Sequence, residues 1–586
     1  MKAEVLSQLY SRQLLWNEAI NRTARNFKFL RDSMRATAES DRVFTGRLLS
    51  ILEKVYMTTP VGANAPVYQP LMLGIFRTDY MRSIDPEINN PVCPVDVPST
   101  VSLATETARQ WKNIEINTIS CSFAGLSPLV QQLHAYLQKY RAASVGVGAE
   151  DGAATDITRR GESAYITDTV HNSAVQVPAA LAETMAIWRN TVPYSYFLRQ
   201  YHQRTGVMLK PIVLVVVQEK EVNTADQYKL LLELLETHGV LSLRRTLAEL
   251  HKTIRQEHAT FADHDFGGGT VGKRDLRVTP HPAFAVVEEK YVVAVAYFRS
   301  TYVPKDLSTE AEWQAREWIE ESNAVKCPSI PYHLMTFKKM QQLMSNVEEV
   351  LAPVSFGGDQ KKAAAVSEHF VPQYSLNKDD YARSAVGRET VKGREMDDPE
   401  HWIADAVAHP DRYVLKPQLE GGGNLISGEA MQRLLRDTRS DNPLYEKIRR
   451  EYILMRMIDY SVVTGIFFRQ NEVHVLENNA CSELGIFGIT LSFNADNYIL
   501  NEAAGSIVRT KPADVQDGGV MAGVAALSSV QVIGQGSNHP ALSPGLSRVK
   551  GKGCSWLLTS TGGAMTIVGA AAATAAAVAW LVKRRV

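Results

Sequence analysis

Several features that mark particular classes of protein are missing from this chain of 586 residues. Lys plus Arg and Asp plus Glu both number 63, so the formal net charge is zero. Because nucleic-acid-binding proteins need a basic surface, this balance argues against a nucleic-acid partner. The 14 histidines show no metal-ligand spacing, and no Gly-x-Ser-x-Gly elbow for a hydrolase nucleophile is present.

Cysteine is scarce, and no Cys-x-x-Cys pair occurs. The five widely spaced cysteines are Cys93, Cys121, Cys327, Cys481 and Cys554. This odd number and wide spacing indicate neither a zinc site nor a disulfide framework, and they fit a reducing compartment. The first residues also lack the apolar stretch and small-residue cleavage site of a secretory signal. We therefore expect a cytoplasmic protein.

Long uncharged apolar runs are also rare, with one exception near the C-terminus. Residues 555–582 carry no charged side chain, have Trp556 and Trp580 near their ends, and are followed by a Lys-Arg-Arg sequence. About 20 apolar helical residues cross a bilayer, and aromatic and basic residues commonly flank them. We predict a single hydrophobic helix that anchors the protein to an intracellular membrane, after a Gly/Ser/Pro-rich linker at 534–553. A buried Ala-rich helix of a soluble protein is the alternative.

Strand and helix patterns alternate along the rest of the chain. Residues 1–57 have helical periodicity, and residues 211–217 and 290–298 are unbroken apolar runs typical of buried parallel strands. Helical patterns at 226–238 and 310–322 follow these two strands. The alternation predicts an α/β protein. Shorter patterns predict strands at 70–76, 113–120, 412–416 and 452–458, a helix at 126–140, and exposed loops at 83–99 and 142–174.

Residues 416–424, Lys-Pro-Gln-Leu-Glu-Gly-Gly-Gly-Asn, have the composition of a phosphate-binding loop. Three consecutive glycines do not stabilise a strand, but they leave backbone N–H groups bare to approach an anion. Lys416 adds a positive charge, and Glu420 offers oxygen ligands to Mg²⁺. The segment therefore predicts an ATP site, with a flexible hairpin tip as the alternative.

Other short patterns suit an ATP and magnesium site, and each has a plainer alternative. Glu115 and Asn117 share one face of a predicted strand, either as half of a Mg²⁺ site or as a solvated surface. Lys338 and the next lysine begin a helix, either to contact phosphate or to face solvent. Arg509 and Lys511 share a strand face that could also be ordinary surface. The strand at 452–458 could bind an adenine edge through an outward backbone, although by itself its sequence favours a core strand.

The order of these motifs resembles that of eukaryotic glutathione synthetase, an ATP-grasp ligase. The matching segments begin with Phe-Arg-Thr-Asp-Tyr-Met at 76–81 and end with Gly-Gly-Val at 518–520, and the likeness stops near Ile533. The segments between them are 115–122, 218–221 with Asn223 and Gln227, 297–302, 326–328, 338–342, 416–424, 482–487 and 509–511. So many motifs in one order are more specific than any one of them.

The resemblance implies a fold and a reaction. It implies an ATP-grasp body built from residues 1–209 and 337–533, a parallel-sheet substrate domain inserted at 210–336, and a glycine-rich lid near 400–480. It implies a ligase that joins γ-glutamylcysteine and glycine through an acyl phosphate, with ATP as co-substrate and Mg²⁺ as cofactor. Members of the family are commonly homodimers, so we expect a homodimer.

The resemblance also implies a role for each matched site residue. The expected catalytic residues are Arg77, Lys416 and Arg509, and the expected metal ligands are Glu115, Asn117 and Glu420. The expected nucleotide-binding residues are Lys338, Lys416, Gly421, Gly422, Gly423, Asn424, Met455, Ile458, Glu483, Lys511 and Asp517. The expected contacts to the dipeptide and to glycine are Arg77, Ser120, Ser122, Asn223, Gln227, Arg299, Tyr302, Arg509, Val520 and Met521.

Two stretches depart from the family pattern. After Asn424 the family usually has Asn, Leu and Tyr, where this chain has Leu425, Ile426 and Ser427, so nucleotide contacts from this stretch should differ. Met521 stands where the family often has alanine, and its larger side chain leaves β-alanine open as an acceptor in place of glycine. A membrane-tethered protein that keeps the fold and only binds ligands is a further alternative.

Overall fold

The computed structural model describes most of the chain as far as residue 533. The described residues are 1–57, 69–85, 88, 106–145, 163–165, 171–258, 283–378, 380, 389–391, 394–396, 399–418, 424–436, 443–469, 472–515, 518–521 and 523–533. All of them belong to one compact unit, Met1–His539. The predicted linker and membrane helix lie outside these ranges, and none of the helices within them is both long and apolar enough to cross a membrane.

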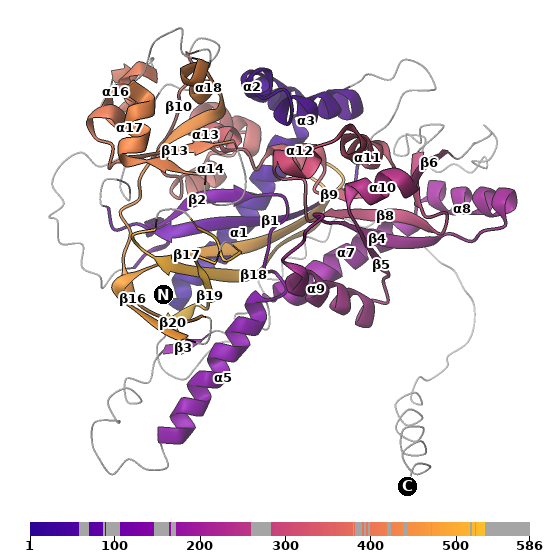
Figure 1. The fold of residues 1–586 in the computed structure, drawn as a ribbon, viewed down its shortest axis with the longest axis horizontal. Helices are drawn as coiled ribbons and strands as arrows, with labels where there is room; N and C mark the ends of the chain where they lie inside the picture. The colour runs from indigo at the N-terminus through magenta and orange to yellow at the C-terminus, as the bar shows by residue number, and fades with distance from the viewer. Residues whose placement is uncertain are drawn as a thin grey trace. The chain divides into compact units, whose positions relative to one another are not determined.

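An antiparallel sheet at the centre joins strands from the two ends of the chain. The strand order is β19–β18–β17–β1–β2, and β16 also pairs with β17 (Figure 1). The strands are β1 (Met72–Arg82), β2 (Trp111–Asn117), β16 (Val463–Arg469), β17 (Glu472–Ser492), β18 (Tyr498–Pro512) and β19 (Ala526–Ser528). Because β1 lies between β17 and β2, segments hundreds of residues apart lie side by side.

Strand β1 is buried on both faces, which explains the unbroken apolar run at its start. Met72 and Phe76 join the core cluster formed with helices α1 (Ala3–Arg25), α2 (Phe27–Ser40) and α3 (Thr45–Leu52). Leu73 and Ile75 point to the opposite face and join the cluster that includes helix α7 (Ser173–Arg189). The predicted N-terminal helices are confirmed.

The second sheet has the order β5–β4–β8–β7–β6, with β9 paired to β8. Its strands are β4 (Lys210–Val216), β5 (Ser242–Arg245), β6 (Ile254–His258), β7 (Ala283–Val287), β8 (Tyr291–Phe298) and β9 (Val325–Cys327). β4 pairs with β5 and β8 in parallel, as the apolar runs predicted, whereas β6 and β7 pair antiparallel. The predicted helices are confirmed as α9 (Thr224–Glu236) and α11 (Glu310–Glu321).

A third, antiparallel sheet has the order β10–β15–β13–β14. These strands are β10 (Gln373–Ser375), β13 (Tyr413–Pro417), β14 (Ile426–Ser427) and β15 (Tyr452–Arg456). Helices α16 (Pro399–Ala408), α17 (Gly428–Arg436) and α18 (Pro443–Glu451) accompany the sheet, and together they enclose a separate apolar cluster. Its members include Tyr374, Trp402, Leu415 and Leu435.

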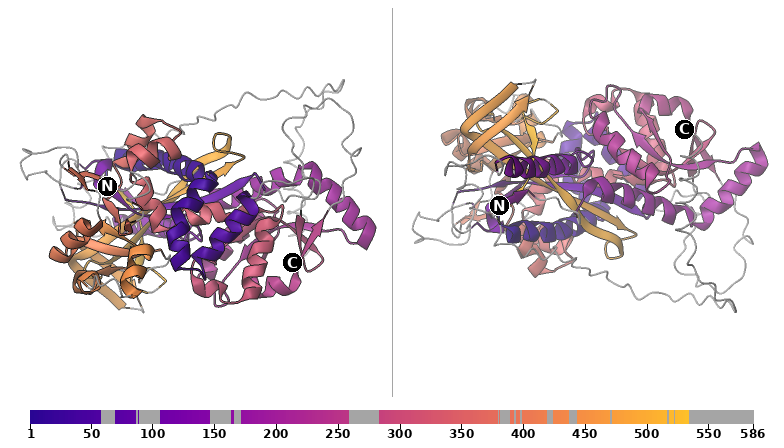
Figure 2. Two further views of the ribbon diagram at one scale, coloured as in Figure 1. Left: turned by 90° about the horizontal axis from the view of Figure 1, so that it is seen from above. Right: turned by 90° about the horizontal axis from the view of Figure 1, so that it is seen from below.

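The N-terminal helices contact the regions around both of these sheets. Helix α2 packs against α18, while Phe44, just before α3, lies 6.1 Å from Trp313 of α11 between ring centroids. The views in Figure 2 show these helices in indigo between the orange third-sheet region and the magenta and pink second-sheet region.

Several boundaries differ from the sequence-based predictions, including the end of β1, which lies at Arg82 instead of 76. Strand β2 ends at Asn117 instead of 120, and Ser120 takes a left-handed conformation with φ of 51°. Helix α5 (Ser127–Val145) runs past the predicted end at 140. Part of the predicted loop at 142–174 is strand β3 (Ser163–Tyr165), which pairs with β20 (Gln531–Ile533). Local composition could not reveal β3, because its hydrogen-bond partner is distant in sequence. The predicted division of residues 1–533 into domains stays a prediction.

Candidate functional site

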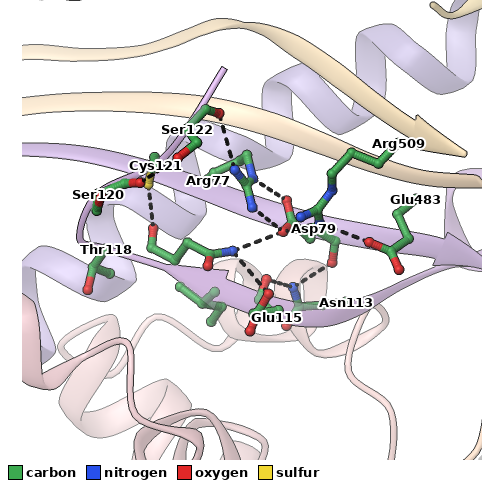
Figure 3. A network of polar contacts seen from close by, with 12 residues as sticks. Arg77, Asp79, Asn113, Glu115, Thr118, Ser120, Cys121, Ser122, Glu483 and Arg509 are labelled. Atoms are coloured by element: carbon green, nitrogen blue, oxygen red, sulfur yellow. Dashed lines mark hydrogen bonds and ion pairs between the residues drawn. The ribbon is translucent and has the colours of Figure 1, made fainter. Parts of the chain in front are cut away.

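Charged side chains gather on one face of the central sheet where β1 passes between β2 and β17 (Figure 3). Arg77 and Asp79 lie two residues apart on β1, so both project from the same face. The strand register places Arg77 opposite Asn117 and Asp79 opposite Glu115, which adds two side chains from β2. A β-bulge follows directly after Asp79, and such bulges are frequent beside active sites.

The fully buried carboxylate of Asp79 lies at the centre of this cluster. Arg77 donates to both of its oxygens, from Nε at 2.7 Å and from Nη2 at 2.8 Å. Arg509 Nη2 donates to Oδ2 at 2.7 Å, and Asn117 Nδ2 donates to the same oxygen at 2.9 Å. Burial by itself would lower the pKa of the Arg77 guanidinium, but the charge of Asp79 outweighs it and raises the pKa above its usual range. The Arg77 guanidinium therefore stays charged.

Side chains of opposite charge also pair between strands β17 and β18. Arg509 Nη2 also lies 2.9 Å from Glu483 Oε2, and Lys511 Nζ lies 3.4 Å from Glu483 Oε1. Lys511 is buried, so the alternative of an ordinary surface strand is wrong for this pair of cations. The side chains of Arg509 and Glu483 each keep 16% of their surface exposed, which leaves this end of the cluster open to a ligand.

A second group of charges joins β2 to Lys338 and to strand β13 of the third sheet. Lys338, at the first position of helix α13 (Lys338–Met344), donates from Nζ to Glu115 Oε1 at 2.7 Å. Lys416 of β13 donates from Nζ to the carbonyl oxygen of Ile114 at 2.7 Å. Burial would raise the pKa of the Glu115 carboxyl, but the charges of Lys338 and Lys416 outweigh it and hold the pKa well below its usual range. Because Lys338 is buried, the solvent-facing alternative for this helix start is wrong.

Glu115 and Asn117 provide the donor chemistry that Mg²⁺ requires. Both carry side-chain oxygens on the same strand face, and carboxylate and amide oxygens are ligands that this ion prefers. Within the described residues no group of three or more His, Cys, Asp or Glu side chains could hold a metal. The third predicted ligand, Glu420, lies outside those residues, as do Gly421, Gly422, Gly423 and Asp517.

Arg299 fastens the loop after β2 to the second sheet. Its Nη1 donates to the carbonyl oxygen of Cys121 at 2.6 Å, and its Nη2 lies 3.2 Å from Ser122 Oγ and 3.3 Å from Asp226 Oδ2. Asp226, fully buried at the start of α9, also accepts hydrogen bonds from several backbone N–H groups of the same loop. The loop that carries Ser120 and Ser122 is therefore held from both sheets, since Arg77 Nη1 also lies 3.4 Å from the Ser122 carbonyl.

The remaining predicted substrate residues lie around the second sheet or near the end of the central one. Asn223 Nδ2 lies 3.3 Å from Asp226 Oδ2, and Gln227 accepts from Arg244 at 2.8 Å. Tyr302 accepts from Gln218 at 2.8 Å, and partial burial raises the pKa of its hydroxyl. Val520 packs against the apolar cluster that includes helix α7 and residues of both the central and the second sheet, whereas Met521 is 47% exposed.

The predicted adenine region is apolar, but its backbone does not point outward. Met455 and Ile458 are buried together with Val414, and Leu425 packs against them. Strand β15 pairs with β10 on one side and with β13 on the other, so the N–H and C=O groups of Tyr452–Arg456 are engaged in the sheet. The core strand favoured from the sequence is therefore confirmed for Tyr452–Arg456, and the alternative of an outward backbone does not hold for these residues.

Sequence reasoning missed Asp79 and Asp226, which organise the two halves of the site. A signal for Asp79 was present, because the spacing of two from Arg77 on a predicted strand places both on one face. Asp226 gave no local signal, since its partners come from a loop about a hundred residues earlier and from Arg299.

Comparison with known proteins identifies the family. The family described as "Eukaryotic glutathione synthase, ATP binding domain" matches residues 2–532. The chain belongs to this family, which confirms the resemblance seen in its motifs. Chloroplastic glutathione synthetase of Arabidopsis thaliana is 32% identical over 519 residues, covering 89% of this chain and 74% of the relative. Glutathione synthetase of Homo sapiens is 28% identical over 532 residues, covering 90% of this chain and 86% of the relative.

Among solved structures, a glutathione synthetase like-effector from Globodera pallida in apoform has a similar fold. The TM-score is 0.53 at 16% sequence identity, with 91% of this chain and 88% of the other covered. At this identity the likeness concerns the fold alone, and it agrees with the mixed α/β architecture described above.

Proposed function

We propose that this protein is an ATP-dependent ligase that joins γ-glutamylcysteine to glycine and so forms glutathione. The observation that carries the proposal is the convergence of cations from distant segments across one face of the central sheet and beside its edge strand β2. These cations are Arg77, Lys338, Lys416, Arg509 and Lys511. Relatives at 27–32% identity across the family that are named glutathione synthetase support the reaction.

The proposed reaction proceeds in two steps. The cysteinyl carboxylate of γ-glutamylcysteine attacks the γ-phosphate of ATP, which gives an acyl phosphate and ADP. The amine of glycine then attacks the acyl carbon, the C–N bond forms and phosphate leaves. Phosphoryl transfer depends on charge neutralisation and alignment more than on a protein nucleophile. Lys338 and Lys416 would neutralise the phosphate oxygens, while Arg77 and Arg509 would orient the substrate carboxylates.

Mg²⁺ belongs to the proposal because the donor set on β2 fits it. When bound, the ion would neutralise charge on the β- and γ-phosphates. Glu115 and Asn117 would hold it together with Glu420. The Glu115 carboxylate also accepts a hydrogen bond from Lys338. A proposed metal ligand and a proposed phosphate-binding lysine are therefore in direct contact.

The ATP-grasp arrangement and its lid are also part of the proposal. Residues 400–480 would form the lid, 210–336 the substrate domain, and 1–209 with 337–533 the body. The third sheet supports this division, because it has its own apolar core and carries Lys416 on β13. A closing lid would keep the acyl phosphate away from water.

The identity of the acceptor amine is the most detailed part of the proposed function. Met521 is 47% exposed, and a larger side chain than alanine changes the space near the acceptor end. Glycine is the proposed acceptor, and β-alanine is the alternative. Comparing the two amines in a phosphate-release assay distinguishes them, since the true acceptor gives the higher kcat/KM.

The proposal extends to location and assembly. We place the enzyme in the cytoplasm, with residues 555–582 as a membrane anchor and with a homodimer as the working assembly. Fractionation of cells tests the anchor, because release of the protein without detergent would contradict it. Sedimentation of the purified chain tests the dimer.

The decisive experiment is a coupled assay on the full chain. ATP, Mg²⁺, γ-glutamylcysteine and glycine should give glutathione and phosphate in equal amounts. Omission of either amino-acid substrate should abolish phosphate release. A protein that binds ATP without forming product would favour the alternative of a non-catalytic membrane-tethered binding protein.

A further inference from the structure

Asp79 has no role in the reaction steps above, although it joins three of the residues that do. Its carboxylate is fully buried and is surrounded by these partners. It accepts hydrogen bonds from Arg77, Arg509 and Asn117, which come from three different strands. Two of these residues are proposed to bind substrate carboxylates, and the third is proposed to bind Mg²⁺.

A glycine makes one of these contacts possible. Asp79 and Arg509 lie on β1 and β18, which are separated by β17. The residue of β17 that pairs with Asp79 is Gly485. A Cβ at Gly485 would lie 2.6 Å from Asp79 Oδ1 and 2.9 Å from Arg77 Cδ, which is closer than real Cβ contacts allow. The missing side chain leaves room beside β17 for the Asp79 carboxylate and for the Arg77 side chain that holds it.

The orientation of the Asn117 amide follows from the same carboxylate. Asn117 Nδ2 lies 2.9 Å from Asp79 Oδ2 and 3.4 Å from Glu115 Oε2. Ionised carboxylates only accept hydrogen bonds, so the NH₂ group must face them. The amide oxygen therefore occupies the other branch of the side chain, where it can serve as a metal ligand. Without a carboxylate at position 79, the Asn117 amide loses the shorter of the two hydrogen bonds that fix its orientation.

We infer that Asp79 is a positioning residue that aligns the substrate-binding arginines with the magnesium-binding amide of Asn117, and that Gly485 supplies the space for this arrangement. The inference rests on the proposed function. Outer partners that orient metal ligands typically change metal affinity or activity by about 10- to 100-fold when they are replaced.

The variant Asp79→Asn tests this role with almost no change in shape. All three donors reach Oδ2, so an amide oxygen in that place keeps them, but its NH₂ group then faces Arg77 Nε, and the negative charge that the three donors share is gone. We expect the affinity for Mn²⁺, titrated by its electron paramagnetic resonance signal with a non-hydrolysable ATP analogue present, to fall about tenfold. We expect kcat to fall about 10- to 100-fold. The KM for γ-glutamylcysteine should rise as well, because Arg77 and Arg509 lose the carboxylate that aligns them.

Glu320→Gln is the matched control. Glu320 is also fully buried and accepts from Arg316 at 2.6 Å, but it lies on α11 and contacts none of the site residues. Both variants lose a buried carboxylate and should lower the melting temperature. Only Asp79→Asn should weaken Mn²⁺ binding. If Asp79→Asn lowers the melting temperature yet keeps wild-type Mn²⁺ affinity, Asp79 is only structural and the inference is overturned.

A double variant tests the route of action. If Asp79 acts through the amide, adding Asp79→Asn to Asn117→Ala should weaken Mn²⁺ binding no further. An additional loss would overturn the coupling. Should Asp79→Asn not fold, Gly485→Ala must show the same loss of Mn²⁺ affinity, and wild-type affinity in that variant would refute the inference. Failure of the wild-type protein to make glutathione would reject the proposed function instead, since Mn²⁺ binding is measured without turnover.

Discussion

Two buried charge clusters in this protein are built from the same chemical groups but differ in what surrounds them. In one cluster Asp79 holds Arg77 and Arg509, and in the other Glu320 holds Arg316. The Glu320 cluster is closed. Both members lie on α11 four residues apart with no exposed side-chain surface, and the Arg316 guanidinium lies 4.1 Å from the Phe298 ring centroid.

The Asp79 cluster draws its members from separate strands and opens to solvent at its ends. The side chains of Glu483 and Arg509 are 16% exposed, and that of Glu115 is 26% exposed. Cations at an open end can exchange a protein carboxylate for a ligand phosphate or carboxylate, whereas cations in a closed cluster cannot. Burial of a charged pair thus has opposite meanings in the two regions, stability in one and ligand binding in the other.

The largest effect is expected at the proposed nucleotide-binding residues. Lys416→Ala or Glu420→Ala should reduce kcat/KM by roughly 100- to 1,000-fold, because the first removes a positive charge that would stabilise the transferred phosphoryl group and the second removes a proposed Mg²⁺ ligand. The melting temperature should change little, and Lys361→Ala, at an exposed position of helix α14 (Gln360–Ser367), serves as control. Near-normal turnover in either site variant would refute the assignment of these residues.

The closed cluster should respond in stability instead. Glu320→Ala leaves Arg316 buried without its carboxylate, which should lower the free energy of unfolding by about 3–5 kcal/mol in urea titrations. The kcat/KM per folded molecule should stay at the wild-type value. Glu310→Ala breaks the exposed pair with Arg47 and should leave stability unchanged. A specific loss of catalysis in Glu320→Ala would erase the distinction between the clusters.

Ligand exchange at the open cluster should appear as thermal stabilisation. A non-hydrolysable ATP analogue with Mg²⁺ at about 100 times its Kd should stabilise the wild-type protein by about 2.7 kcal/mol. Glu320→Gln should keep this increment, because its cluster has no open end. Lys416→Ala should lose most of it at the same analogue concentration. Equal increments in these two variants would contradict the exchange of partners.

The smallest effect is a change in how stability depends on pH. Burial lowers the pKa of the Lys326 amino group from 10.5 to about 8, opposed by Glu320 and assisted by Arg316. The unfolded chain therefore binds the extra proton between pH 8 and 10.5, so the contribution of this group to stability rises across that window and is lowest below it. Lys326→Met should flatten this rise in urea titrations. If Lys326→Met keeps the wild-type slope of stability against pH, Lys326 is not the source of that slope.

The fold was predictable where a local pattern suffices. The runs of β-branched residues at 211–217 and 290–298 correctly indicated buried parallel strands, because burial on both faces leaves no place for polar residues. The pairing of β3 with β20 was not predictable, since each strand is three residues long and its hydrogen bonds come from the other end of the chain.

The site was predictable in parts. Glu115 and Asn117 were assigned as half of a metal site, and the structure places both on one strand face beside Lys338. The buried state of Lys338 was not predictable, because two adjacent lysines usually face solvent. Desolvation of this lysine depends on β2, and only the folded chain brings Glu115 to it.

The sequence by itself determined the α/β class, the family and the identity of the residues that carry charge in the site, because these follow from local periodicity and from motifs in a fixed order. The tertiary structure alone decided how those charges pair. Arg509 meets Asp79 only because the antiparallel register of β1, β17 and β18 brings the two residues to one face of the sheet, and Gly485 leaves room there for the Asp79 carboxylate. Electrostatic interactions depend on distance and burial, and neither quantity is encoded in the spacing of residues along a chain.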